Sequence, residues 1–286
     1  MRSSAFCPGH VTGFFEICPS EEILSMGSRG AGMCLSLGAT SHVSAKEDEK
    51  QRIEVKLDGR SSRAPVTKAA VKYLLGNRRQ SIKISTQLDL PQSQGLGMSA
   101  AGALSASLAL SDILGENRQR AFEAAHVAEI RCGSGLGDVS ALYRGGITVR
   151  RKPGLPPRGE VLRIGGTPEV VLAVIGRRIL TKSVLSDPAK RAAINRAGAR
   201  RVDAIVSDRS LGRLMELSAS FALESGLASH RVREAMNASS KLGSSSMAML
   251  GNSVFAIGDS RGLARILDDF GQTFACLVDS RGPRLT

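Results

Sequence analysis

The feature that most constrains this chain is a glycine-rich turn between an expected strand and an expected helix. Residues 82–85 alternate apolar and polar side chains, which predicts a strand, and they lead into the turn PQSQGLGMSAA at residues 91–101. Residues 99–114 are small and apolar nearly all round, so we expect a closely packed, buried helix that ends at Gly115. Glycines let a backbone approach a ligand closely, and a helix start offers unpaired N–H groups. The pattern therefore indicates a phosphate site.

The glycine turn by itself is compatible with more than one kind of site. Residues 95–100 fit the dinucleotide fingerprint Gly-x-Gly-x-x-Ala. That fold needs a second strand ending in an acid about 20 residues later, where we expect a helix. A Walker loop needs Gly-Lys-Ser or Gly-Lys-Thr, and the sequence contains neither tripeptide. The glycines could also serve only close packing at the start of the helix.

A second segment of small residues, GSGLGDVSALYRGG at residues 133–146, contains a single carboxylate, Asp138. Taken alone, an aspartate in a glycine-rich turn is typical of a helix cap. Glu129 lies nine residues earlier at the end of an expected helix, and His126 precedes it by one turn on the same face. A carboxylate and the Ser99 hydroxyl would form part of a Mg²⁺ shell, which ATP oxygens and water would complete.

The organisation along the chain predicts two α+β domains with mixed or antiparallel sheets. The segment KPGLPPRG at residues 152–159 breaks regular structure, so we expect domains at residues 1–155 and 160–286. A regular βαβαβ alternation is absent. Asp187 and Pro188 predict a helix cap and a first-turn proline. Further strands are expected at residues 53–57, 147–150, 170–175, 254–257 and 274–278, and helices at 118–130, 189–206, 210–224, 231–240 and 261–270.

The net charge of +13 raises the question of nucleic-acid binding. The excess is spread evenly, +6 over residues 1–153 and +7 over residues 154–286. Only 3% of the residues are aromatic and none is Trp, so platforms for stacking bases are scarce. We therefore expect no nucleic-acid partner.

Cysteine usage and hydropathy favour a cytoplasmic protein. The five cysteines are scattered and show no metal-ligand spacing, so we expect reduced thiols. No apolar run reaches the length of a membrane span, and residues 1–7 lack the apolar segment of a secretory signal. We expect no membrane partner, and a homodimer stays open.

Three stretches together resemble the GHMP kinases, the superfamily of galactokinase, homoserine kinase and mevalonate kinase. PGHV at residues 8–11 looks like the first family motif, residues 91–101 look like the phosphate loop, and residues 135–146 look like the catalytic-aspartate segment. The resemblance implies a two-domain GHMP kinase fold. Its N-terminal domain would be ribosomal-protein-S5-like and its C-terminal domain ferredoxin-like α+β. ATP and Mg²⁺ are the implied cofactors.

Departures from the family pattern point to one branch. The first motif continues as TGFFEI instead of Gly-Glu-His, Met98 replaces the first serine of the phosphate loop, and the third motif is poor in glycine. Residues 8–17, 27–32 and 246–252 look like those of archaeal pantoate kinases. This implies phosphorylation of pantoate to 4-phosphopantoate in coenzyme A biosynthesis. Another small alcohol, such as homoserine, mevalonate or shikimate, is the alternative, and a binding protein of this fold without catalysis is a second one.

The resemblance also implies roles for individual residues. Asp138 would be the catalytic carboxylate, and Ser99 and Glu129 would hold Mg²⁺. A pantoate carboxylate needs a cation, and an arginine at the end of the strand after the aspartate segment, Arg150, is the first candidate. The expected phosphate-binding residues are Pro91, Gly95, Leu96, Gly97, Met98, Ser99 and Ala100, and the other expected substrate residues are Ser28, His126 and Thr181. A hydrogen-bonded, half-buried histidine is the structural alternative for His126.

Overall fold

The computed structural model describes residues 1–179 and 181–286, and within these ranges the chain forms two β-sheets covered by helices. The first sheet has the order β12-β1-β2-β5-β3-β4, and β6 pairs with β2 and with β7. Only β3 and β5 are parallel among its described strands. Its strands are β1 (Arg2–Cys18), β2 (Gly27–Glu47), β3 (Arg52–Leu57), β4 (Arg60–Ser61), β5 (Gln80–Leu88), β6 (Ile147–Lys152), β7 (Glu160–Ile164) and β12 (Arg284–Leu285).

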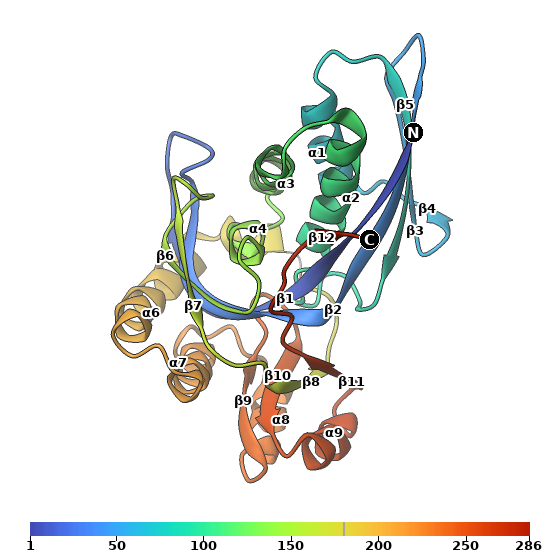
Figure 1. Cartoon of the computed structure of the whole chain (residues 1–286). Coiled ribbons are helices and arrows are strands. Elements are labelled where there is room, and N and C mark those ends of the chain that lie inside the picture. Colours follow the sequence, from blue (N-terminus) through green and yellow to red (C-terminus); the bar gives the residue numbers. More distant parts are fainter. Residues whose placement is uncertain (180) are drawn as a thin grey trace.

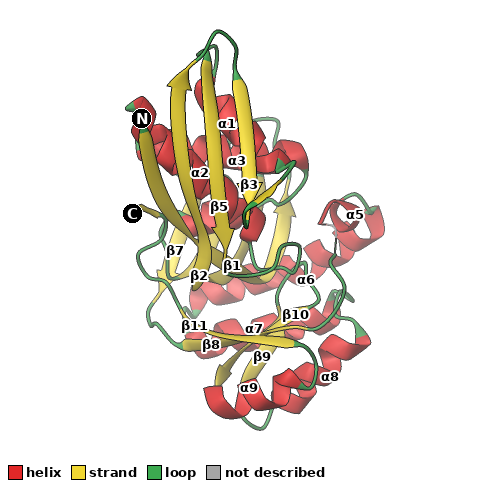
Figure 2. Ribbon diagram, turned by 90° about the vertical axis from the view of Figure 1, so that its right-hand side faces the viewer, coloured by secondary structure: helices red, strands yellow, loops and turns green. Residues whose placement is uncertain are grey.

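The second sheet is antiparallel, with the order β11-β8-β10-β9. Figure 2 shows it below the first sheet, with strands that run across the direction of β5 and β3. Its strands are β8 (Glu169–Val174), β9 (Gly243–Met247), β10 (Ser253–Gly258) and β11 (Gln272–Leu277). The expected α+β content with mixed or antiparallel sheets is confirmed.

Helices α1 and α2 lie on one face of the first sheet, and α3 packs on these two helices (Figure 1). The central helix α2 is buried along most of its length because its residues are small and apolar. It begins after Gly97 and ends at Gly115, and both glycines have a positive φ, 66° and 67°, which other residues rarely adopt. The helices of this half are α1 (Pro65–Leu75), α2 (Met98–Leu114), α3 (Arg118–Cys132) and the short α4 (Asp138–Leu142).

Helices α6 to α9 pack around the second sheet and under the first, and α5 packs against α6. Figure 1 shows α6 and α7 beneath the bent ends of β1 and β2, and α8 and α9 against the second sheet. Asp187 caps α6 by accepting hydrogen bonds from the N–H groups of Ala189 and Lys190, as expected. These helices are α5 (Thr181–Leu185), α6 (Pro188–Ser207), α7 (Leu211–Glu224), α8 (His230–Ser239) and α9 (Ser260–Asp268).

Two long strands tie the halves together. β1 and β2 pair along most of their length, from Arg2 opposite Ser44 to Cys18 opposite Gly27. Isolated bridges join Thr12 to Met249 and Leu35 to Val278. β7 and β12, which lie after the expected boundary, both belong to the first sheet. The division at residues 155–160 stays a prediction.

Most of the expected elements are confirmed to within a few residues, including the strands that became β3, β5, β6, β8, β10 and β11 and the helices α2, α3 and α6 to α9. β1, β2 and α1 were not expected as elements. The five cysteines are all free. In the described ranges, no helix combines the length and the apolar character that crossing a membrane requires.

Candidate active site

A cavity of about 570 Å³ opens between the start of α2, the segment around α4, and the loop after β9. Most of the residues predicted from the sequence line it, although they come from distant parts of the chain. Those in its wall are Ser28, Gly95, Leu96, Gly97, Met98, Ser99, Glu129, Asp138, Arg150 and Thr181. The structure thus gathers the expected phosphate, metal, catalytic and substrate residues around one space.

The glycine turn presents the start of α2 to this cavity. The first helical hydrogen bond of α2 runs from the Ala101 N–H to the Gly97 carbonyl, at 2.9 Å. No described side chain caps the start of the helix. The His10 N–H donates to the Leu96 carbonyl at 3.1 Å, which ties the turn to β1. A Cβ on Gly95 would lie 2.4 Å from the Ala248 carbonyl oxygen, so only glycine fits between the two loops. The uncapped N–H groups form a site for an anion.

His10 and Asp138 form a close polar pair beside the cavity. Nδ1 of His10 lies 2.9 Å from Oδ1 of Asp138, and the ring is fully buried in β1 while the carboxylate is partly exposed. Burial lowers the pKa of His10, and the hydrogen bond and charge of Asp138 oppose that shift. Because a carboxylate only accepts, a neutral ring in this contact carries its proton on Nδ1. His10 therefore donates to Asp138 and fixes one of its two oxygens.

Arg150 is a buried cation without a full set of partners. It lies in β6 opposite Gly30, is 1% exposed, and its Nε and Nη1 have no hydrogen-bond partner among the described residues. Burial lowers the pKa of its guanidinium, and the carboxylates of Asp138 and Glu129 raise it. An arginine keeps its charge at neutral pH. Its free N–H groups therefore suit an anionic group in the cavity.

Because Gly137 has no side chain, the side chains of Ser28 and Arg150 can lie close to the segment that carries Asp138. A Cβ on Gly137 would lie 2.2 Å from Oγ of Ser28 and 2.8 Å from Nε of Arg150. Any larger residue would push both side chains away from the segment that begins α4 and carries Asp138. The Gly-Asp step thus allows a hydroxyl, a guanidinium and a carboxylate to meet at one wall.

Glu129 and Ser99 supply oxygen donors to the same cavity. Burial raises the pKa of Glu129, and the nearby Asp138 carboxylate raises it further, while the Val139 N–H and Arg150 oppose the shift. Among the described side chains, no group of three or more His, Cys, Asp or Glu could hold a metal alone. A carboxylate and a hydroxyl fit Mg²⁺, which takes hard oxygen ligands and is usually held by one or two carboxylates together with substrate phosphates and water.

Three expected residues do not line the cavity: Pro91, Ala100 and His126. His126 is buried in α3, and its Nε2 lies 3.2 Å from the Ile23 carbonyl oxygen. Burial lowers its pKa. It contacts the turn that leads into Ser28, so the substrate contact expected of it stays a prediction.

Two residues of the site, His10 and Thr12, had no role in the expectations from the sequence. Oγ1 of Thr12 lies 3.5 Å from Nδ1 of His10, and Thr12 lines the cavity. A histidine inside a motif otherwise made of proline, glycine and valine was the available signal. Its partner, 128 positions later, could not be found from a local pattern.

Known proteins resemble this chain over nearly all of its length. Residues 65–146 match the family model of the GHMP kinases N terminal domain. The pantoate kinase of Methanocaldococcus jannaschii is 30% identical over 96% of this chain and 99% of its own. The pantoate kinase of Methanospirillum hungatei is 32% identical over 99% and 96%.

Solved structures agree with this likeness. A phosphotransferase related to the CoA biosynthesis pathway is 30% identical and superposes with a TM-score of 0.91 over 100% of this chain and 99% of its own. Homoserine kinase from Cytophaga hutchinsonii shares the fold, with a TM-score of 0.71 at 16% identity over 100% and 97%.

Proposed function

Because the chain belongs to the GHMP kinase family, we propose that it transfers the γ-phosphoryl group of ATP to the primary hydroxyl of pantoate. The product would be 4-phosphopantoate, an intermediate of coenzyme A biosynthesis. The relatives that are 30% to 34% identical are pantoate kinases, and they support this substrate over the alternatives.

The observation that carries the proposal is the environment of the Arg150 side chain. Its guanidinium is buried in the cavity wall, and two of its nitrogens lack a partner among the described residues. A buried N–H group without a hydrogen-bond acceptor is unfavourable, and a carboxylate can accept two parallel hydrogen bonds from a guanidinium. The carboxylate of pantoate would complete this group, with the Ser28 hydroxyl beside it. Thr181 lines the cavity from α5 and is proposed as a further substrate contact.

Asp138 is proposed to act on the hydroxyl that attacks the phosphate. His10 engages Oδ1 of Asp138, which leaves Oδ2 for the substrate hydroxyl. Asp138 would orient this hydroxyl and accept its proton as the new P–O bond forms and the bond to ADP breaks. The N–H groups at the start of α2 would hold the phosphates, which keeps the transferred group near the hydroxyl.

Ser99 and Glu129 are proposed to hold Mg²⁺. When bound, the metal supplies positive charge that offsets the charge on the transferred phosphoryl group. Burial raises the pKa of Glu129 in the metal-free protein. A bound cation would favour the ionised carboxylate, which is the form that holds the metal.

A panel of alcohols tests the substrate. Homoserine, mevalonate and shikimate also carry a carboxylate, so Arg150 alone does not separate them from pantoate. Release of ADP should be followed with each alcohol at equal concentrations of ATP and Mg²⁺. We expect the highest kcat/KM for pantoate. A higher value for another alcohol would overturn the substrate assignment and leave the kinase assignment in place.

Location and assembly are proposed mainly from the sequence. Free cysteines suit a reducing compartment, and we propose that the enzyme works in the cytoplasm. A homodimer stays a prediction, which light scattering of the purified protein tests directly.

A further inference from the structure

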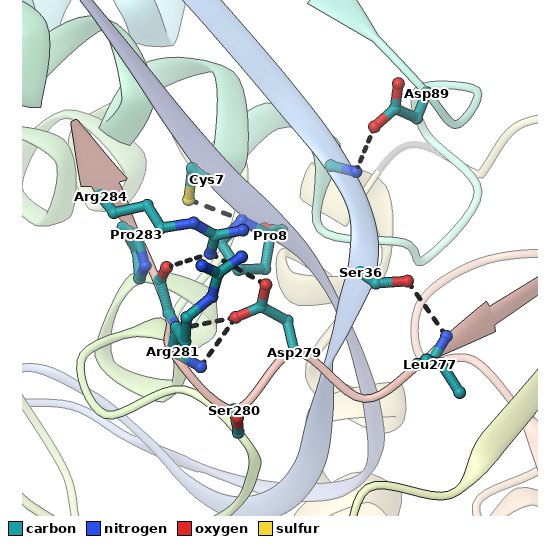
Figure 3. Close-up of polar contacts among 12 residues, drawn as sticks. Cys7, Pro8, Ser36, Asp89, Leu277, Asp279, Ser280, Arg281, Pro283 and Arg284 are labelled. Atoms are coloured by element: carbon teal, nitrogen blue, oxygen red, sulfur yellow. Dashed lines mark hydrogen bonds and ion pairs between the residues drawn. The ribbon is translucent and has the colours of Figure 1, made fainter. Parts of the chain in front are cut away.

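The segment between β11 and β12 lies outside the cavity wall, and Figure 3 shows it around Asp279. It contacts the turn between α4 and β6, the two elements that carry Asp138 and Arg150. Asp138 begins α4 and Arg150 lies in β6, and residues 143–146, which end with Gly145 and Gly146, connect these elements. The segment crosses from the second sheet to the first and ends in β12, beside β1. What holds this turn therefore contributes, together with the pairing of β6 to β2 and β7, to how the carboxylate and the guanidinium are placed relative to each other.

Three backbone hydrogen bonds close a ring around the turn. The Gly146 N–H donates to the Asp279 carbonyl at 2.7 Å, the Cys34 N–H donates to the Gly146 carbonyl at 3.0 Å, and the Asp279 N–H donates to the Cys34 carbonyl at 3.0 Å. Cys34 lies directly opposite His10 in the pairing of β1 and β2. The ring thus joins the turn to the strand pair that holds His10 against Asp138.

The side chain of Asp279 shapes the segment that enters this ring. It is buried, and its Oδ1 accepts hydrogen bonds from the N–H groups of Arg281 at 3.0 Å and Gly282 at 2.7 Å. Its Oδ2 accepts from Nη1 of Arg284 at 2.9 Å, and Figure 3 shows the carboxylate between these partners. Without this carboxylate the N–H groups of the turn at residues 279–284 would lose their acceptor.

The two turns then pack backbone against backbone. A Cβ on Gly145 would lie 2.5 Å from the Gly282 nitrogen, and a Cβ on Gly146 would lie 2.6 Å from Nη2 of Arg163. Arg163 also donates to the Ser280 carbonyl at 3.3 Å. Such close approach leaves the Gly145–Gly146 turn little room to shift.

We propose that Asp279 is a positioning residue for the phosphoryl transfer: through the ring of hydrogen bonds it holds the turn that contributes to the placement of Asp138 relative to Arg150. The inference rests on the proposed function in one respect, that Arg150 anchors the acceptor alcohol. A displacement of about 1 Å at a reacting group can cost 10²-fold in rate, so a residue outside the cavity can govern the reaction.

The first test compares Asp279→Ala with Asp279→Asn. The alanine variant leaves the N–H groups of Arg281 and Gly282 without an acceptor, whereas asparagine keeps an oxygen for them. For Asp279→Ala we expect a higher KM for pantoate, a lower kcat, and a loss in kcat/KM of about 10–100-fold per folded enzyme. The KM for ATP should stay unchanged because no residue of the segment lines the cavity beside the start of α2. Asp279→Asn should recover most of the loss.

A matched control separates positioning from stability. Asp259 caps α9, which packs against the second sheet, by accepting from the Gly262 N–H at 3.2 Å. Asp259→Ala should lower the melting temperature but leave kcat per folded enzyme and both KM values unchanged. If Asp279→Ala behaves in the same way, its role is structural only and the proposal is wrong.

If Asp279→Ala does not fold, a second pair of variants tests whether the packing of the Gly145–Gly146 turn affects catalysis. Gly145 and Gly115 have nearly equal positive φ, 64° and 67°, so alanine costs similar backbone strain at both. Only at Gly145 does the new Cβ meet the Gly282 backbone, since no described atom lies within 4 Å at Gly115. Gly145→Ala should raise the KM for pantoate and Gly115→Ala should not. Equal kinetics in the two variants would overturn the proposal.

The substrate preference of the parent enzyme distinguishes a failure of this inference from a failure of the proposed function. If the parent prefers another alcohol, the substrate assignment fails. The same variants are then compared with the preferred alcohol, and their kinetics still decide whether Asp279 positions the site.

Discussion

Nδ1 of His10 lies 2.9 Å from Oδ1 of Asp138, although 128 positions separate the two residues in the chain. The histidine lies in β1 near the start of the sequence, and the aspartate, which lines the cavity, begins α4 in the middle. The contact joins β1 to the start of α4. It also leaves one oxygen of Asp138 free for the acceptor alcohol.

The His10 contact predicts a kinetic effect without a change of charge. Burial lowers the pKa of His10, so the ring is neutral at pH 7. His10→Leu should lower kcat by about 10–100-fold because Asp138 loses the donor that orients it. His10→Asn offers an amide N–H and should recover part of this loss. Steady-state kinetics on the folded variants provide the measurement, and parent-like kcat in His10→Leu would refute the orienting role.

Asp138→Asn tests the proton acceptor. The change is nearly isosteric, but it removes the charge and the ability to take a proton. We expect kcat to fall on the order of 10²–10⁴-fold, which is usual for a general base. The Kd for ATP, measured by calorimetry, should change little. Near-normal kcat would remove Asp138 from the mechanism.

Glu129 predicts how stability depends on pH. Its pKa is raised in the folded, metal-free protein, whereas in the unfolded chain it ionises near its usual value of about 4.3. Between these two pKa values the folded state binds more protons than the unfolded state, so the parent loses stability as the pH rises through this window.

Glu129→Gln has no ionisable group at this position, so it should not lose stability in this way as the pH rises. Without metal it should melt at a higher temperature than the parent at pH 7, and the difference should shrink towards pH 4. With metal it should need more Mg²⁺ for half-maximal activity. Glu123→Gln on the same helix, where Glu123 pairs with Arg120 at the surface, is the control and should show neither effect. A lower melting temperature for Glu129→Gln at pH 7 would contradict this account.

Ser99→Ala tests the second metal ligand. Ser99 lies in the first turn of α2 and lines the cavity, so the variant should raise the Mg²⁺ concentration needed for half-maximal activity. Ser107→Ala is the matched control because Ser107 is buried in the same helix and does not line the cavity. Mg²⁺ titrations of the two variants give the comparison. If both variants need the same Mg²⁺ concentration for half-maximal activity, Ser99 has no role in metal binding.

Local patterns predicted much of the fold. The helix α2 follows from small apolar residues that end at a glycine, and the start of α6 follows from the Asp187 cap and the proline after it. These signals lie within a few residues of the element that they predict. The meeting of Ser99 and Asp138 at one cavity was expected from the family resemblance, and Arg150 was expected there because it ends the short strand after the Asp138 segment.

Other features depend on contacts between distant segments. β1 and β2 show little alternation because both faces of their central parts are buried, and half-buried strands are the ones that alternate. The expected boundary at residues 155–160 gave no sign that β7 and β12 pair with the first sheet. The role of His10 depends on a partner that only tertiary structure supplies.

The central claim is that Arg150 anchors the carboxylate of the acceptor alcohol. The most direct measurement is the ratio of kcat/KM for pantoate to that for its uncharged amide, in the parent and in Arg150→Ala. Removing one partner of a buried charge pair typically costs about 3–5 kcal/mol, and less where the pair is partly hydrated. We therefore expect the parent to favour pantoate on the order of 10²–10³-fold. In Arg150→Ala the preference should disappear with an unchanged KM for ATP. A variant that still prefers pantoate as strongly as the parent would contradict the account.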